Sequence, residues 1–161
     1  MRLLILISVL LAASNLSLAQ ATVYQNDRYA FSFQYPSKAL RSKSDAIGTK
    51  LVSPDGRVTI FVYASVNMNE PDILGYHHTS FWANRCHRQR FTKRTDTELI
   101  SEGVSERQRC YMRIIRHKFA EADIYYNIIV KYPNSQRQKW EPIGTALSES
   151  FSFDPRANVR P

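Results

Sequence analysis

Apolar side chains recur at every second position in several stretches of this chain, and this period of two restricts the fold more than any other feature. In 29–35 (YAFSFQY) an aromatic residue occupies every other position. In 124–132 (IYYNIIVKY) both alternating sets of residues are largely apolar. A strand with one apolar face lies half-buried on a core, whereas two apolar faces need cover on both sides. We therefore expect an antiparallel sheet with a layer on each face.

A turn sequence, Pro54-Asp55-Gly56, predicts a hairpin between 50–53 and 57–65, because Pro presets φ and Gly tolerates a positive φ. The other expected strands, joined by short turns, are 97–104, 107–119, 124–132 and 150–153. An antiparallel meander is the simplest topology for them.

Two helices are expected to cover this sheet. The first is predicted over 70–85, with Asn69 as its N-cap and Pro71 in its first turn. Its apolar stripe consists of Ile73, Leu74, Phe81 and Trp82. The second is predicted over 139–148, where Trp140, Ile143 and Leu147 follow helical spacing. The fold class is therefore α/β in the α+β sense, with an antiparallel sheet of about six to seven strands sandwiched between helices in a single domain.

Residues 1–19 have the parts of a secretory signal peptide: Arg2, an apolar run over 3–13, and small residues up to Ala19. Cleavage after Ala19 predicts a periplasmic or secreted protein. The apolar run is shorter than the roughly 20 residues that span a bilayer, which argues against a transmembrane anchor; an uncleaved N-terminal anchor is the alternative. Residues 20–154 then form one domain, and 155–161 are expected to be a flexible tail.

The two cysteines, Cys86 and Cys110, are interpreted through this expected compartment. An even number of thiols in an oxidising environment usually pairs, so we predict a disulfide between them. The spacing rules out a CxxC dithiol, and a lone nucleophilic cysteine beside His87 is the alternative.

Positive charge is concentrated in one part of the chain. Residues 85–118 hold ten Lys and Arg against four acidic residues, out of a net charge of +8 for the whole chain. Such a field attracts anionic partners, although a solvated face that aids solubility is the plain alternative. The predicted basic surface consists of Arg85, Arg88, Arg90, Arg113 and Arg116.

The opening YAFSFQYPS and the closing YPNSQRQKWEPIGTALSESFSF, in which a strand ends in Tyr-Pro and a helix leads into Ser-Phe, resemble the PsbP/Mog-like superfamily. The resemblance covers about the first 45 and the last 30 residues of the expected mature chain. It implies an antiparallel sheet between helices and a non-enzymatic binding or adaptor role. It transfers no site residue, and the basic middle of the chain does not match the superfamily.

Enzymatic alternatives depend on the four histidines. A ribonuclease-like hydrolase would use His78 and His117 as acid and base, with Arg113 stabilising the phosphorane. Adjacent His77 and His78 point about 100° apart on a helix and do not form a metal pair. Phosphate loops, GxSxG and HExxH motifs are absent from the sequence. No catalytic residue, metal or cofactor is therefore predicted.

The sequence thus predicts an exported, non-enzymatic binding or adaptor protein. Its partner is expected to be an acidic protein or an anionic envelope component held by the basic surface. Arg and aromatic residues lie close together in 85–94, which also fits nucleic acid, but the expected compartment argues against that partner. The small basic hydrolase is the alternative function.

Overall fold

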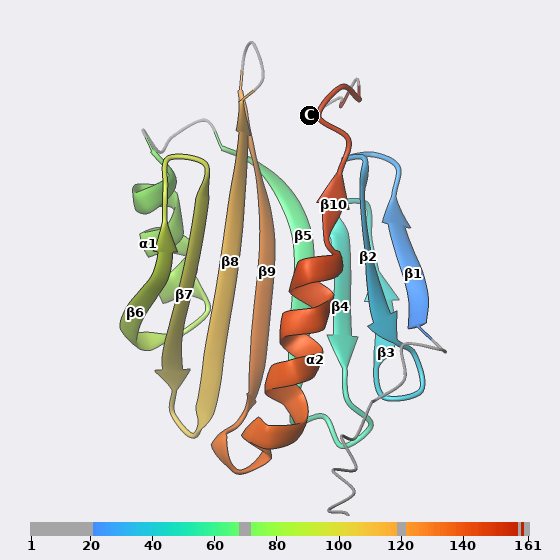
Figure 1. Ribbon diagram of the computed structural model, residues 1–161, viewed down its shortest axis with the longest axis vertical. Coiled ribbons are helices and arrows are strands. Elements are labelled where there is room, and N and C mark those ends of the chain that lie inside the picture. The colour runs from blue at the N-terminus through green and yellow to red at the C-terminus, as the bar shows by residue number, and fades with distance from the viewer. Residues whose placement is uncertain (1–20, 68–71, 119–121, 158, 160–161) are drawn as a thin grey trace, which may run out of the picture.

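The computed structural model describes residues 21–67, 72–118, 122–157 and 159 (Figure 1). Within them the strands are β1 (Ala21–Asn26), β2 (Phe31–Pro36), β3 (Arg41–Ser44), β4 (Gly48–Val52), β5 (Thr59–Asn67), β6 (His87–Arg94), β7 (Glu98–Ser105), β8 (Gln108–Lys118), β9 (Asp123–Pro133) and β10 (Ser152–Phe153). The helices are α1 (Ile73–Ala83) and α2 (Arg137–Ser150), the latter preceded by a 3-10 turn, η2 (Asn134–Gln136).

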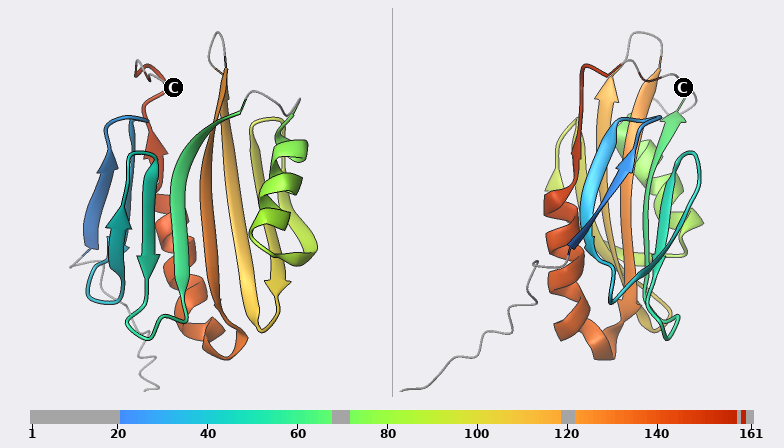
Figure 2. Two further views of the ribbon diagram at one scale, coloured as in Figure 1. Left: turned by 180° about the vertical axis from the view of Figure 1, so that it is seen from behind. Right: turned by 90° about the vertical axis from the view of Figure 1, so that its right-hand side faces the viewer.

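Seven strands form one sheet in the order β3-β4-β5-β9-β8-β7-β6, and a smaller sheet has the order β1-β2-β10. Every strand pair in both sheets is antiparallel. Helix α2 and the small sheet lie on one face of the large sheet, and α1 lies on the opposite face (Figure 2). This single α+β domain confirms the predicted fold class, and the small sheet is a separate layer that the sequence analysis did not resolve.

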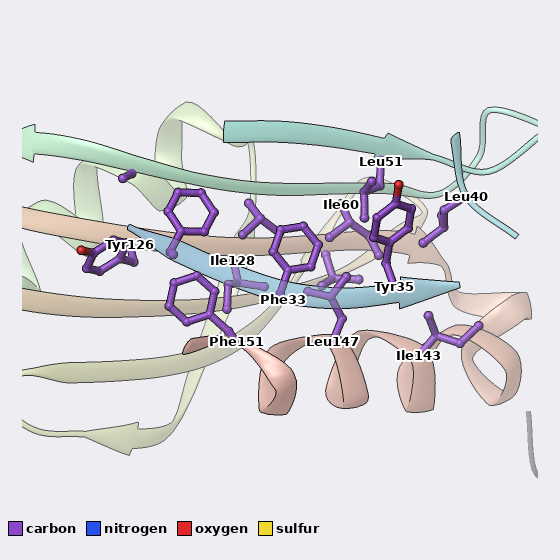
Figure 3. Packing of buried hydrophobic residues seen from close by; sticks show 14 of the residues in the cluster. Phe33, Tyr35, Leu40, Leu51, Ile60, Tyr126, Ile128, Ile143, Leu147 and Phe151 are labelled. Carbon is purple, nitrogen blue, oxygen red and sulfur yellow. The ribbon is translucent and has the colours of Figure 1, made fainter. Parts of the chain in front are cut away.

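The larger core lies between the large sheet, the small sheet and α2 (Figure 3). Phe31, Phe33 and Tyr35 occupy alternate positions of β2 and are at most 7% exposed, which confirms the predicted half-buried strand. Helix α2 contributes Ile143 and Leu147 to the same core. Each such side chain stabilises the fold by roughly 1.5–3 kcal/mol when it leaves water.

A second core lies beneath α1. Ile73 and Phe81 of this helix pack against Leu99, Met112 and Ile129 of the large sheet. The helix begins after Asp72, whose Oδ1 accepts a hydrogen bond from the Gly75 N–H at 2.7 Å.

The predicted N-cap, Asn69, lies outside the described residues, and Asp72 is the cap that the structure provides. The helix ends at Ala83, two residues before the predicted end. It is therefore shorter than the sequence pattern indicated.

Three strands were not predicted: β1, β3 and β6. Strand β6 has exposed residues on both faces and two irregularities in its pairing with β7, between His87 and Arg90 and between Phe91 and Lys93. A bulge shifts the alternation of side chains by one residue, so no regular period of two remains in the sequence.

The ends of the chain are only partly described. The expected leader, residues 1–19, lies outside the described residues. The flexible tail expected over 155–161 stays a prediction; of this segment, Val159 is 7% exposed and belongs to the larger core. In the described part of the chain, neither helix has the length and apolar character needed to span a bilayer.

A disulfide joins Cys86 to Cys110, as predicted. Both residues are buried, and their Cα atoms lie 6.2 Å apart. The bond ties the segment that follows α1 to the middle of the large sheet, because Cys110 lies on β8.

Replacing both cysteines with serine is expected to lower the free energy of unfolding by about 3 kcal/mol, because the disulfide closes a long loop in the unfolded chain. Urea denaturation of the double variant beside the oxidised wild type measures this loss. An unchanged unfolding midpoint would show that the bond does not contribute to stability.

His77 is fully buried between α1 and the sheet. Its Nε2 lies 2.7 Å from Ser101 Oγ, and its Nδ1 lies 3.1 Å from the Gln89 amide nitrogen. The amide donates to Nδ1, so the neutral ring, with its proton on Nε2, satisfies both partners. Burial, together with the neighbouring charge of His78, lowers the pKa of His77 from 6.5 to about 4.

This lowered pKa makes stability depend on pH. The unfolded chain takes up a proton near pH 6.5, whereas folded His77 takes one up only near pH 4. The contribution of neutral His77 to the free energy of unfolding is therefore complete above pH 6.5. It is lost as the pH falls from 6.5 to about 4, with a slope of at most about 1.4 kcal/mol per pH unit. We expect His77→Gln to lose less stability than the wild type between pH 7 and 4.5 in urea denaturation. Equal slopes, or an imidazole NMR signal of His77 that titrates near pH 6.5, would contradict this assignment.

Candidate functional site

Trp82 is 59% exposed at the end of α1, although it was predicted to belong to the apolar stripe of that helix. It lies one residue beyond the buried Phe81, about 100° further around the helix, which turns it outward. Its Nε1 donates a hydrogen bond to His78 Nε2 at 3.0 Å, and the His87 ring lies edge-on at 5.6 Å between centroids. The indole N–H is thus satisfied within the protein while much of the ring stays available for contact.

Next to Trp82 the chain turns from α1 into β6 through residues 83–88; we call the turn together with Trp82 the α1–β6 corner. Arg85 and Arg88 adopt φ values of 53° and 51°. A residue with a Cβ adopts this left-handed conformation at a cost of roughly 1–2 kcal/mol, which glycine does not incur. Cys86 between them is buried and disulfide-bonded, so the strained turn is fixed in place. Both arginine side chains are left exposed.

A third cation lies beneath the corner. Lys131 Nζ donates to the carbonyl oxygen of Asn84, at the C-terminal end of α1, at 2.5 Å. Burial lowers the pKa of Lys131, and the charge of Arg85 lowers it further. Among the described residues, no carboxylate forms an ion pair with Arg85, Arg88 or Lys131. Positive charge at the corner is therefore not balanced by an acidic side chain.

The cations on the α2 side of the sheet form ion pairs with two carboxylates. Glu102 on β7 lies between Arg90 on β6, at 4.0 Å, and Arg109 on β8, at 3.9 Å. Arg90 is exposed, and its ion pair with Glu102 is loose.

Glu98 lies in the same way between Lys93 and Arg113. Burial acts to raise the pKa of Glu98, but hydrogen bonds from both cations more than offset this and lower it. Arg113 also donates to the backbone oxygen of Ser148 on α2. This arginine therefore links β7, β8 and the helix, and is not a free surface charge.

Arg116 lies on the α1 side of β8, because side chains of a strand alternate and it is three residues from Arg113. Its Nε donates to Asp123 Oδ2 at 2.7 Å, and its side chain is 13% exposed. The structure thus divides the five arginines predicted to share one surface. It brings Arg85 and Arg88 together at the corner with Arg90 on the adjoining strand, and it uses Arg113 and Arg116 inside the fold.

The three residues of the hydrolase alternative do not meet. His78 lies on the α1 side, paired with Trp82, whereas Arg113 lies on the α2 side of the sheet. His117 also faces that side, with its ring 5.3 Å from Phe153 of the small sheet. The sheet separates His78 from Arg113 and His117, so the three side chains cannot act on one phosphate. Within the described ranges, no three His, Cys, Asp or Glu side chains are placed to hold one metal ion.

The sequence did not predict the place of Trp82 in the corner or of Lys131 beneath it. Lys131 is the one charged residue in the alternating run 124–132, and this departure from an apolar pattern was the available signal. Trp82 gave no such signal, because it directly follows Phe81 and fits the same apolar stripe of α1.

No protein-family model matches this chain, and a search of curated proteins finds no match. Solved structures do match. The solution structure of cyanobacterial PsbP (CyanoP) from Synechocystis sp. PCC 6803 has a TM-score of 0.56 and 8% identity, over 86% of this chain and 95% of that one. LpqN of Mycobacterium tuberculosis, described as involved in cell envelope biogenesis, has a TM-score of 0.57 and 9% identity, over 84% and 91% of the two chains.

Identities this low establish the fold and leave the function open. The agreement nevertheless spans nearly the full length of both known structures. The chain therefore has the PsbP/Mog-like fold, as the resemblance in its first and last strands predicted.

Proposed function

We propose that this protein is an exported, non-enzymatic binding or adaptor protein that recognises an acidic protein or an anionic envelope component through the α1–β6 corner. The observation that carries the proposal is the pair of exposed arginines held in a left-handed backbone beside an exposed tryptophan. Glycine at these two positions would remove the strain. Arginine is kept at both positions in spite of this strain, which supports a role for the two side chains in binding.

The chemistry of the corner fits an anionic partner. A guanidinium binds a carboxylate or a phosphate through two parallel hydrogen bonds. No carboxylate of the described residues forms an ion pair with Arg85 or Arg88. Trp and Arg are also the residues that contribute most to protein interfaces, where an aromatic anchor lies beside charged contacts. Arg90, further along β6, is exposed and only loosely paired with Glu102 on the α2 side of the sheet.

The expected compartment supports the same function. The disulfide fits an oxidising environment, and cleavage of the leader after Ala19 would deliver the domain to the periplasm or the exterior. Anionic lipids, glycans and acidic proteins are available there, whereas cytosolic nucleic acid is not.

Replacing Arg85 and Arg88 together with glycine is expected to stabilise the fold and weaken binding at the same time. Relief of the left-handed strain, less the added flexibility of glycine in the unfolded chain, should raise the free energy of unfolding by about 1 kcal/mol. Binding to immobilised poly-L-glutamate in 50 mM salt should weaken about tenfold, and wild-type binding should fall steeply as salt rises.

A matched control removes the same charge elsewhere, through Arg107→Gln and Lys118→Gln, both at exposed positions. This control should keep most of the wild-type affinity. If it binds as weakly as the glycine variant, the interaction reflects net charge alone, and the corner is not the site. Vesicles of phosphatidylglycerol, tested in the same way, determine whether the phosphates of an envelope lipid replace the carboxylates.

Trp82 offers a direct optical reading of the same contact, because the other tryptophan, Trp140, is 2% exposed. Saturating poly-L-glutamate should reduce acrylamide quenching of Trp82, and Trp82→Ala should abolish this change and weaken binding severalfold. The substitution should leave the unfolding midpoint nearly unchanged, because the Trp82 side chain is largely exposed to solvent. Quenching that stays the same at saturation would place the partner elsewhere.

A further inference from the structure

The face of the large sheet that carries α1 is only partly covered. Helix α1 packs over β7 and β8, and its Tyr76 reaches Ser65 of β5. Strand β4 and the other end of β5 lie beyond the helix on that side (Figure 2). A surface groove of about 380 Å³ runs across this open region, lined by residues of β3, β4, β5 and the turn between β3 and β4. It lies toward the β3 edge of the sheet, and the α1–β6 corner adjoins the opposite edge.

The floor of the groove is apolar. Phe61 and Tyr63 lie two residues apart on β5 and point to the same side, and Ile47, at 41% exposed, forms a wall. Gly48 pairs with Tyr63, and a Cβ at position 48 would lie 2.6 Å from the Tyr63 Cβ, so glycine is needed to keep this floor. Burial, reinforced by Tyr76, raises the pKa of Tyr63, so that its hydroxyl stays neutral.

Two lysines form the rim. Lys43 on β3 and Lys50 on β4 are directly opposite each other in the antiparallel pair, where like charges repel. Lys50 Nζ lies 5.4 Å from the centre of the Phe61 ring, at the boundary between rim and floor. Neither lysine forms an ion pair with a carboxylate of the described residues.

Asp45 also lines the groove, but its Oδ1 accepts hydrogen bonds from the backbone N–H groups of Ile47 and Gly48, each at 3.0 Å. It holds the turn in place, and among the described residues it forms no ion pair with Lys43 or Lys50. A negative group placed between the two ammonium groups would remove their repulsion and turn it into attraction.

We propose that this groove binds a free fatty acid, with its carboxylate between Lys43 and Lys50 and its acyl chain along Ile47, Phe61 and Tyr63. Ammonium groups recognise a carboxylate as compact point charges, and the aromatic floor offers the chain an apolar surface. The volume falls within the usual range for small-molecule sites. This site is independent of the α1–β6 corner.

Laurate is a suitable probe, titrated calorimetrically with the full mature chain below its micelle concentration. We expect binding with a dissociation constant on the order of 10–100 μM, as suits a ligand of this size in an open groove. Dodecyltrimethylammonium has the same chain with a positive head, and it should bind at least tenfold more weakly. Equal affinity for the two amphiphiles would overturn the proposal, because the lysines would then contribute nothing.

Lys43→Glu is the informative variant, since it places a carboxylate of the protein itself opposite Lys50. It should raise the unfolding midpoint, because repulsion becomes attraction, and weaken laurate binding at least tenfold. Lys118→Glu makes the same charge change at an exposed position outside the groove and should leave laurate binding within twofold of the wild type.

If Lys43→Glu and Lys118→Glu weaken laurate binding equally, the proposal is overturned, because the net charge of the protein would then account for binding. Retention on phosphatidylglycerol vesicles that depends on Lys43, without binding of free laurate, would overturn it in favour of a membrane surface. Poly-L-glutamate binding at the corner should be unaffected by Lys43→Glu, so failure of either site can be distinguished from failure of the other.

Discussion

The architecture depends on β9, the middle strand of the large sheet, being removed from water on both faces. Seven consecutive residues of this strand, 124–130, are buried. A strand in this position cannot be stable in a two-layer fold with one open face, because its second apolar face would stay hydrated. The small sheet and α2 together form the layer on one face of β9, and α1 forms the layer on the other face. Other features of the molecule follow from how far each layer extends.

Layer α1 is short, and both proposed sites lie where it stops. At its C-terminal end the chain must reverse into β6, and the disulfide fixes this reversal by joining Cys86 to β8. Beyond its flank toward β5 and β4, the sheet continues without a helix over it (Figure 2). On the other face, α2 and the small sheet form the longer layer, and the cations on that face form ion pairs with Glu98 and Glu102.

The sequence predicted those parts of the fold in which one physical signal dominates. Strands 29–35 and 124–132 were found because a buried face imposes a period of two, and the disulfide because compartment and cysteine count agree. Strand β6 was missed because its bulges break the period and water reaches both of its faces. The basic surface was predicted only in part. A count of charges along the chain places Arg113 and Arg116 together, whereas the alternation of side chains on β8 places them on opposite sides of the sheet.

A count of charges along the sequence does not show which cations form ion pairs in the fold. Glu98 and Glu102 lie on β7 and each pairs with one cation of β6 and one of β8, so part of the positive charge is paired within the fold. At one edge of the sheet, backbone strain remains at Arg85 and at Arg88. At the other edge, Lys43 and Lys50 repel each other. One substitution at each strained position, or at one of the lysines, would remove the unfavourable interaction. Cations that pair with carboxylates serve packing on the α2 face, and the cations without such pairs at the two edges are the basis of both proposed anion sites.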